Sequence, residues 1–75
     1  MEITETNHKI RIGKRIAELR KERGLSQAKL AQLTGIQSSY IGQIELGKYD
    51  VGISMLSKIG DALEMTLDFI PKEKK

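Results

Sequence analysis

The chain has 75 residues, of which 31% are charged and 39% hydrophobic, and its net charge at pH 7 is +3. This length suits one small domain and leaves no room for a two-lobed enzyme with a deep substrate cleft. The absence of cysteine excludes disulfides and thiolate metal sites, and the absence of a long apolar run argues against a membrane span or a secretion signal. We therefore expect a soluble cytoplasmic protein that is not an enzyme and holds no cofactor or metal ion.

Residues 1–9 are expected to form an N-terminal arm, because the segment is polar and chain termini are poorly ordered by default. A weak edge strand is the alternative, since Thr4 and Thr6 have some strand propensity. His8 has no cluster of donors beside it, so we interpret it as a solvated side chain and not as a metal ligand.

A first helix is predicted from Ile10 to Arg23. Ile12, Ile16 and Leu19 recur at the spacing of one apolar stripe, and charged residues fill the opposite face. Gly13 weakens this helix by about 1 kcal/mol relative to alanine, which suggests either close packing or a later start.

The segment from residue 9 to residue 29 carries an excess of positive charge. It holds eight Lys and Arg against two Glu, whereas the rest of the chain is slightly acidic. This asymmetry favours a polyanionic partner on one face. A soluble helix with a cationic exposed side is the alternative.

Residues 26–45 read as two short helices joined at Gly35. Ser26 is suited to cap the first of them, and Gly35 supplies the positive φ that ends a helix at low cost. The second helix buries Ile41 and Ile44. Its outward residues are amides, a hydroxyl and a glycine, which suits the reading of base edges in a DNA groove. Ordinary solvent-exposed polar residues of a small bundle are the alternative interpretation.

A loop over residues 46–52 leads to a last helix, predicted from Ile53 to Leu63. Residues 65–70 then alternate between apolar and polar side chains, and Pro71 follows, which favours a strand over a helix. A lone strand needs a partner, so we expect residues 65–71 to pair with the same segment of a second subunit. The side chains expected in this dimer contact are Met65, Leu67 and Phe69. Residues 72–75 are a charged tail, which leaves residues 10–64 as the domain that binds DNA.

Several short motifs together resemble the helix-turn-helix domain of phage repressors, Cro proteins and their bacterial relatives. The resemblance covers residues 10–63 and rests on the joint spacing of Gly24-Leu25-Ser26-Gln27, Leu30-Ala31, Gly35-Ile36, Tyr40-Ile41, Ile44-Glu45 and Gly47-Lys48. It implies an all-α, lambda-repressor-like bundle of four or five helices. It also implies a homodimer that binds double-stranded DNA at an inverted repeat, usually to repress transcription.

The resemblance also implies roles for individual residues. Gln27 would bond to a phosphate and brace the recognition helix, while Tyr40 and Lys48 would grip phosphates. Arg20 and Glu45 match a buried or half-buried ion pair that ties the first helix to the end of the third. The positions that face bases or the adjoining backbone are Gln37, Ser38, Ser39 and Gln43.

The chain departs from the family pattern in three places. Gly42 replaces a longer side chain on the recognition helix, Val51 stands where the loop often has proline, and the strand-like tail replaces a fifth helix. Similar tails occur in helix-turn-helix antitoxins, so an antitoxin that binds a toxin as well as its operator is the alternative function. No paired carboxylates, activated nucleophile or metal cluster supports catalysis.

Overall fold

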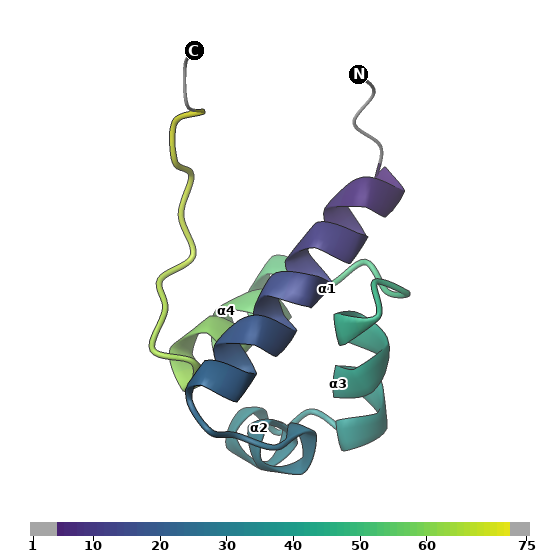
Figure 1. The fold of residues 1–75 in the computed structure, drawn as a ribbon, viewed down its shortest axis with the longest axis vertical. Helices are drawn as coiled ribbons and strands as arrows, with labels where there is room; N and C mark the ends of the chain where they lie inside the picture. The colour runs from purple at the N-terminus through teal and green to yellow at the C-terminus, as the bar shows by residue number, and fades with distance from the viewer. Residues whose placement is uncertain (1–4, 73–75) are drawn as a thin grey trace.

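The computed structural model describes residues 5–72, and these residues form an all-α fold without a strand. α1 runs diagonally across the molecule, α3 lies along one side of it, and α2 closes the end of the bundle where α1 finishes (Figure 1). α1 packs on α3, and α2 packs on both α3 and α4. The four helices are α1 (Glu5–Glu22), α2 (Gln27–Thr34), α3 (Ser38–Glu45) and α4 (Ile53–Ala62).

α1 begins at Glu5, whereas the sequence predicted a start at Ile10. Residues 5–9 of the expected arm are therefore helical, and an edge strand is wrong for this part of it. Neither glycine nor proline lies between Glu5 and Lys9, so the helix meets no residue that would interrupt it. The remainder of the arm, residues 1–4, lies outside the described residues.

The core consists of aliphatic side chains from all four helices and the turns that join them. Burial of these apolar groups is the main force that holds such short helices together. Ile12 and Leu56, both predicted to face inward, are only partly buried at the edge of this core. The most deeply buried side chains are Leu30, Ile41, Ile44, Ile59 and Leu63, each less than 2% exposed.

Gly13 lies where α1 comes into close contact with the backbone at the end of α3. A β-carbon here would lie 2.9 Å from the carbonyl oxygen of Glu45 and closer still to that of Ile44. α1 continues through Gly13 without a break. Because Gly13 has no side chain, α1 can approach the backbone of α3 at this point. Of the two interpretations offered by the sequence, close packing is the correct one.

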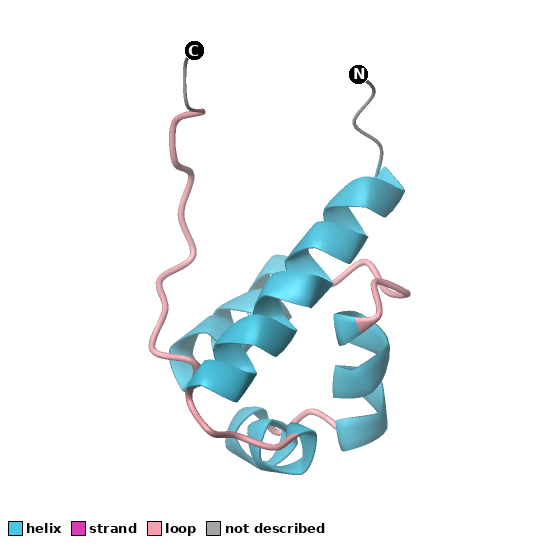
Figure 2. Ribbon diagram, in the orientation of Figure 1, coloured by secondary structure: helices cyan, strands magenta, loops and turns pink. Residues whose placement is uncertain are grey.

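The C-terminal segment differs from its prediction. The Met65 N–H donates to the Gly60 carbonyl at 2.8 Å, and the chain then leaves the bundle as an irregular loop (Figure 2). The strand predicted over residues 65–71 is therefore wrong. A strand is made by its hydrogen bonds to a neighbour, and the part of the chain from residue 5 to residue 72 contains no other strand with which this segment could pair.

Candidate nucleic-acid interface

Local hydrogen bonds define both ends of α2. The Ser26 hydroxyl accepts from the Lys29 N–H at 2.9 Å and so caps α2. At the other end, Gly35 adopts the left-handed conformation, with φ of 74°, and its N–H donates to the Ala31 carbonyl at 2.8 Å. Both features follow from the residues that the sequence supplies at these positions.

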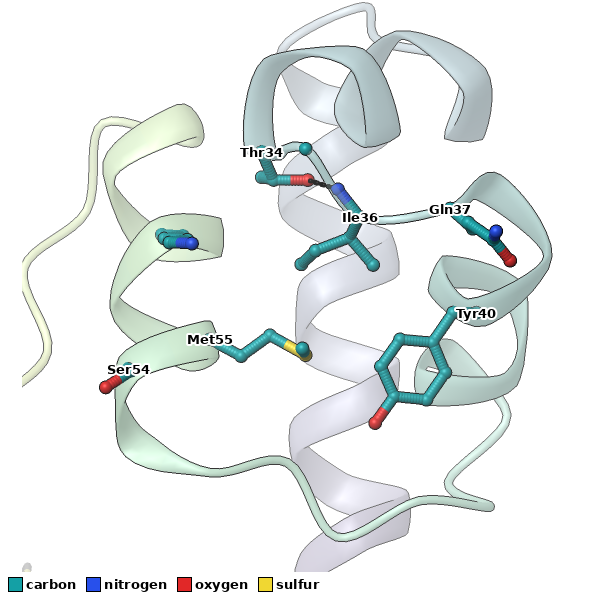
Figure 3. Close-up of a pocket in the computed structure, with 8 residues that line it drawn as sticks. Thr34, Ile36, Gln37, Tyr40, Ser54 and Met55 are labelled. Atoms are coloured by element: carbon teal, nitrogen blue, oxygen red, sulfur yellow. Dashed lines mark hydrogen bonds between the residues drawn. The ribbon is translucent and has the colours of Figure 1, made fainter.

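Thr34 closes the turn between the two helices from the inside. Its buried hydroxyl donates to the Leu30 carbonyl at 2.8 Å and accepts from the Ile36 N–H at 3.3 Å (Figure 3). The turn is thus bonded to α2 through a side chain that solvent does not reach. These bonds hold the backbone at Ile36, two residues before α3 begins.

The outward face of α3 carries short, uncharged polar side chains. Ser38 and Ser39 are exposed, while Gln43 is half-buried one turn further along. Gln37 precedes the helix as its N-cap residue but makes no side-chain capping bond, so its carboxamide is exposed and available. The four side chains expected to face bases therefore lie on or beside the accessible part of α3.

Gln27, the first residue of α2, extends its side chain to α3. Its Nε2 donates to Glu45 Oε1 at 3.0 Å, and its carboxamide covers Gly42, where a β-carbon would lie 3.5 Å from Gln27 Oε1. The side chain thus braces the recognition helix and fills space that Gly42 leaves. This bond joins residues 18 positions apart, and no local sequence signal indicates it.

The structure brings Arg20 and Glu45 together as a bidentate ion pair. Arg20 Nε donates to Glu45 Oε2 at 2.7 Å and Nη2 donates to Oε1 at 3.1 Å, and the side chains are only 11% and 6% exposed. A further guanidinium N–H bonds the Leu25 carbonyl at 2.8 Å. The hydrogen bond to Glu45 raises the pKa of Arg20, outweighing the desolvation that lowers it. The pair anchors α1 and the turn before α2 to the end of α3.

Tyr40 and Lys48, the expected phosphate contacts, occupy different surroundings. Tyr40 is half-buried, and its ring lies 4.8 Å from that of Tyr49, centroid to centroid. It points into a cavity of about 400 Å³ between α3 and α4, beside Ile36 and Met55 (Figure 3). Lys48 is exposed in the loop after α3. The ammonium group of Lys48 is therefore more accessible to a phosphate than the partly buried Tyr40 side chain is.

Several cations of the basic segment, residues 9–29, already form bonds within the protein. Arg20 is used by the buried ion pair, and Arg23 donates to the Leu63 carbonyl at 2.8 Å, which ties the end of α1 to the end of α4. Arg15 pairs with Glu18 on the surface. Within this segment, the exposed lysines that make no such bond among the described residues are Lys14, Lys21 and Lys29, and Lys48 lies exposed beyond it in the loop after α3.

Two further kinds of site are not found among the described residues. None of the helices in residues 5–72 is both long and apolar enough to cross a membrane. Within the same range, no three His, Cys, Asp or Glu side chains gather to hold a metal ion. The accessible chemistry of this region is hydrogen bonding by amides and hydroxyls beside lysine cations.

Comparison with known proteins places this arrangement among regulators. A family model described as helix-turn-helix matches residues 16–70. The immunity repressor of Bacillus phage phi105 is 35% identical over 63 residues, a match that covers 84% of this chain. The chain spans only 44% of the length of that repressor.

Comparison with solved structures also finds regulators. A transcriptional regulator from Vibrio cholerae superimposes with a TM-score of 0.79 at 41% identity, over 84% of this chain and 35% of the regulator. SinR, a regulator of biofilm formation solved in complex with DNA, gives a TM-score of 0.70 at 36% identity, over 73% of this chain and 89% of SinR.

Proposed function

The chain belongs to the helix-turn-helix family whose model covers residues 16–70, and we propose that it is a transcriptional repressor that binds double-stranded DNA. The observation that carries the proposal is the outward face of α3, which presents hydroxyls and amides without a charge before Glu45. Base edges in the major groove offer hydrogen-bond partners for such groups. The likeness to SinR, whose structure contains DNA, supports the same function.

We assign two kinds of contact. The side chains of α3 read bases, because glutamine amides match adenine and serine hydroxyls bond almost any base. Gln27, Tyr40 and Lys48 hold the backbone, with the lysine displacing counterions from the phosphates. The base-reading residues are Gln37, Ser38, Ser39 and Gln43.

The proposed assembly is a homodimer. In a two-fold dimer the recognition helices enter successive major grooves about 34–36 Å apart, so the binding site is an inverted repeat. The C-terminal segment supplies the contact through apolar side chains. Phe69 and Ile70 are 98% and 83% exposed, whereas Met65 and Leu67 rest partly against the bundle at 38% and 48%.

A repressor is the form of regulator that we favour, because the phage phi105 relative is an immunity repressor. An antitoxin was suggested by the predicted C-terminal strand. That strand does not form in the described residues, so nothing there favours a toxin partner. The proposed activity is binding alone and involves no catalytic step.

Titration of labelled DNA duplexes tests the proposal. The parent protein is first titrated against fragments selected from random DNA, and single-residue variants of the protein are then titrated against the same fragments. Gln43→Ala should weaken binding by about 1–3 kcal/mol at particular base pairs, whereas Lys48→Ala should weaken all sequences alike and reduce the salt dependence. Gln32→Ala is the matched control, because Gln32 is exposed on α2 and lies outside the proposed contact. Absence of any complex at low ionic strength would refute DNA binding, and equal losses on every sequence for Gln43→Ala would refute its base-reading role.

A further inference from the structure

Leu46 is the exposed apolar side chain at the end of the recognition face. It is 64% exposed, and its N–H donates to the Gly42 carbonyl at 3.1 Å. Its backbone remains helical, with φ of −82° and ψ of −4°, so it continues the geometry of α3. At about 3.6 residues per turn, Ser39, Gln43 and Leu46 therefore form one outward stripe about 60° wide.

The following glycine fixes Leu46 at the end of that stripe. Gly47 has φ of 78°, and a β-carbon there would lie 2.8 Å from the Ile10 Cα. The chain therefore turns toward α1 directly after Leu46. The turn is closed by the Lys48 N–H, which donates to the Gln43 carbonyl at 3.1 Å.

The proposed DNA complex limits what Leu46 can contact. It has no donor for a phosphate oxygen, and covering such an oxygen would remove water without replacing its hydrogen bond. Lys48, two residues later, is the group suited to the phosphate. The apolar group that the major groove displays is the C5-methyl of thymine.

We propose that Leu46 is a specificity-determining residue that recognises a thymine methyl group in each half-site. The inference rests on the proposed DNA binding and adds to it one base identity. In this interpretation the outward stripe reads bases in two ways, with hydrogen bonds at Ser39 and Gln43 and with apolar contact at Leu46.

Replacement of thymine by deoxyuridine tests this, because it removes only the methyl group. In the selected duplex, each thymine is replaced in turn, symmetrically in both half-sites, and affinity is measured for the full chain and for Leu46→Ala. For the parent, one replacement should weaken binding about four-fold per half-site, the factor that corresponds to burial of one methyl group. For Leu46→Ala the same replacement should have no effect.

Leu33→Ala is the matched control. Leu33 is 53% exposed on α2, but it lines a cleft with Asp61 and Ala62 of α4 and lies away from the outward stripe. This variant should retain the four-fold response to deoxyuridine.

The outcomes separate the two proposals. Tight binding to the selected duplex with no response to deoxyuridine at any position would overturn the role of Leu46 and leave DNA binding intact. A response that persists in Leu46→Ala would assign the methyl contact to another residue. Failure to bind any duplex would instead overturn the proposed function.

Discussion

The α2–α3 pair and the C-terminal segment both carry a regular apolar pattern, at helical spacing in the first and at every second residue in the other, yet only the first becomes regular structure. In α2 and α3 the apolar positions meet a core, and Leu30 and Ile41 have no exposed area. In residues 65–72 the bundle covers Met65 and Leu67 only in part, and Phe69 is 98% exposed. An apolar pattern therefore specifies an element only where another surface of the chain is positioned to cover it.

The difference also appears in the polar groups. Beside α3, Arg20, Glu45 and Gln27 form a network whose ion pair solvent hardly reaches. In the C-terminal segment, the one bond that Asp68 makes within residues 5–72 is to the N–H of the next residue, at the surface. Substitutions that remove equal numbers of atoms should therefore have very different effects in the two regions.

The largest effect is expected from Glu45→Ala. The change leaves the Arg20 guanidinium nearly buried without its carboxylate and should lower the free energy of unfolding by about 3 kcal/mol. Urea denaturation followed by circular dichroism measures it. Glu18→Ala is the control, because the Arg15–Glu18 pair is more than half exposed and should be worth about 0.5 kcal/mol or less. Equal stability of Glu45→Ala and the parent would remove the anchoring role of the pair.

Gly13→Ala tests the contact between α1 and α3. The added methyl group meets the carbonyl oxygens of Ile44 and Glu45, so the helices must separate at a cost of about 2 kcal/mol despite the gain in helix propensity. Gly42→Ala has the opposite sign, since its nearest neighbour would be at 3.5 Å, and it should gain up to about 1 kcal/mol. Thermal unfolding of both variants gives the comparison. A stabilising Gly13→Ala would contradict the close approach.

Thr34→Val probes the turn of the helix-turn-helix. It keeps the shape of the side chain but removes the hydroxyl that bonds the Leu30 carbonyl and the Ile36 N–H, so we expect a loss of about 1 kcal/mol. The control is Thr66→Val in the exposed C-terminal segment, which should change stability little. Equal effects in chemical denaturation would mean that the buried network contributes nothing to the turn.

Phe69→Ser should have the smallest effect on the fold and a clear effect on assembly. Because Phe69 is exposed, the unfolding free energy of the subunit should change by less than about 0.5 kcal/mol. Sedimentation should nevertheless show loss of the dimer. Ile53→Ser, a change at a side chain 74% exposed on α4, should leave the dimer intact. An unchanged dimer in Phe69→Ser would exclude the C-terminal contact.

Local signals in the sequence were sufficient for α2, α3 and α4. Ser26 and Gly35 act through hydrogen bonds to residues at most four positions away, and the apolar spacing of Ile41 and Ile44 selects the buried face of α3. Such signals are readable because capping and helical periodicity depend on near neighbours in the chain. The same spacing predicts an outward position for Gln37, Ser38 and Gln43, whereas Ser39 and Gln27 were assigned to the interface by the family resemblance.

The tertiary structure determined the features that depend on contacts between residues far apart in the sequence. It assigned Arg23 to the Leu63 carbonyl, 40 positions away, and so withdrew one cation from the basic segment. It placed Gln27 over Gly42 and left residues 65–72 without a strand. The sequence alone determined which side chains each helix presents and which it hides. Only the packed chain decided which of them are already bonded, because those bonds form between surfaces that folding brings together.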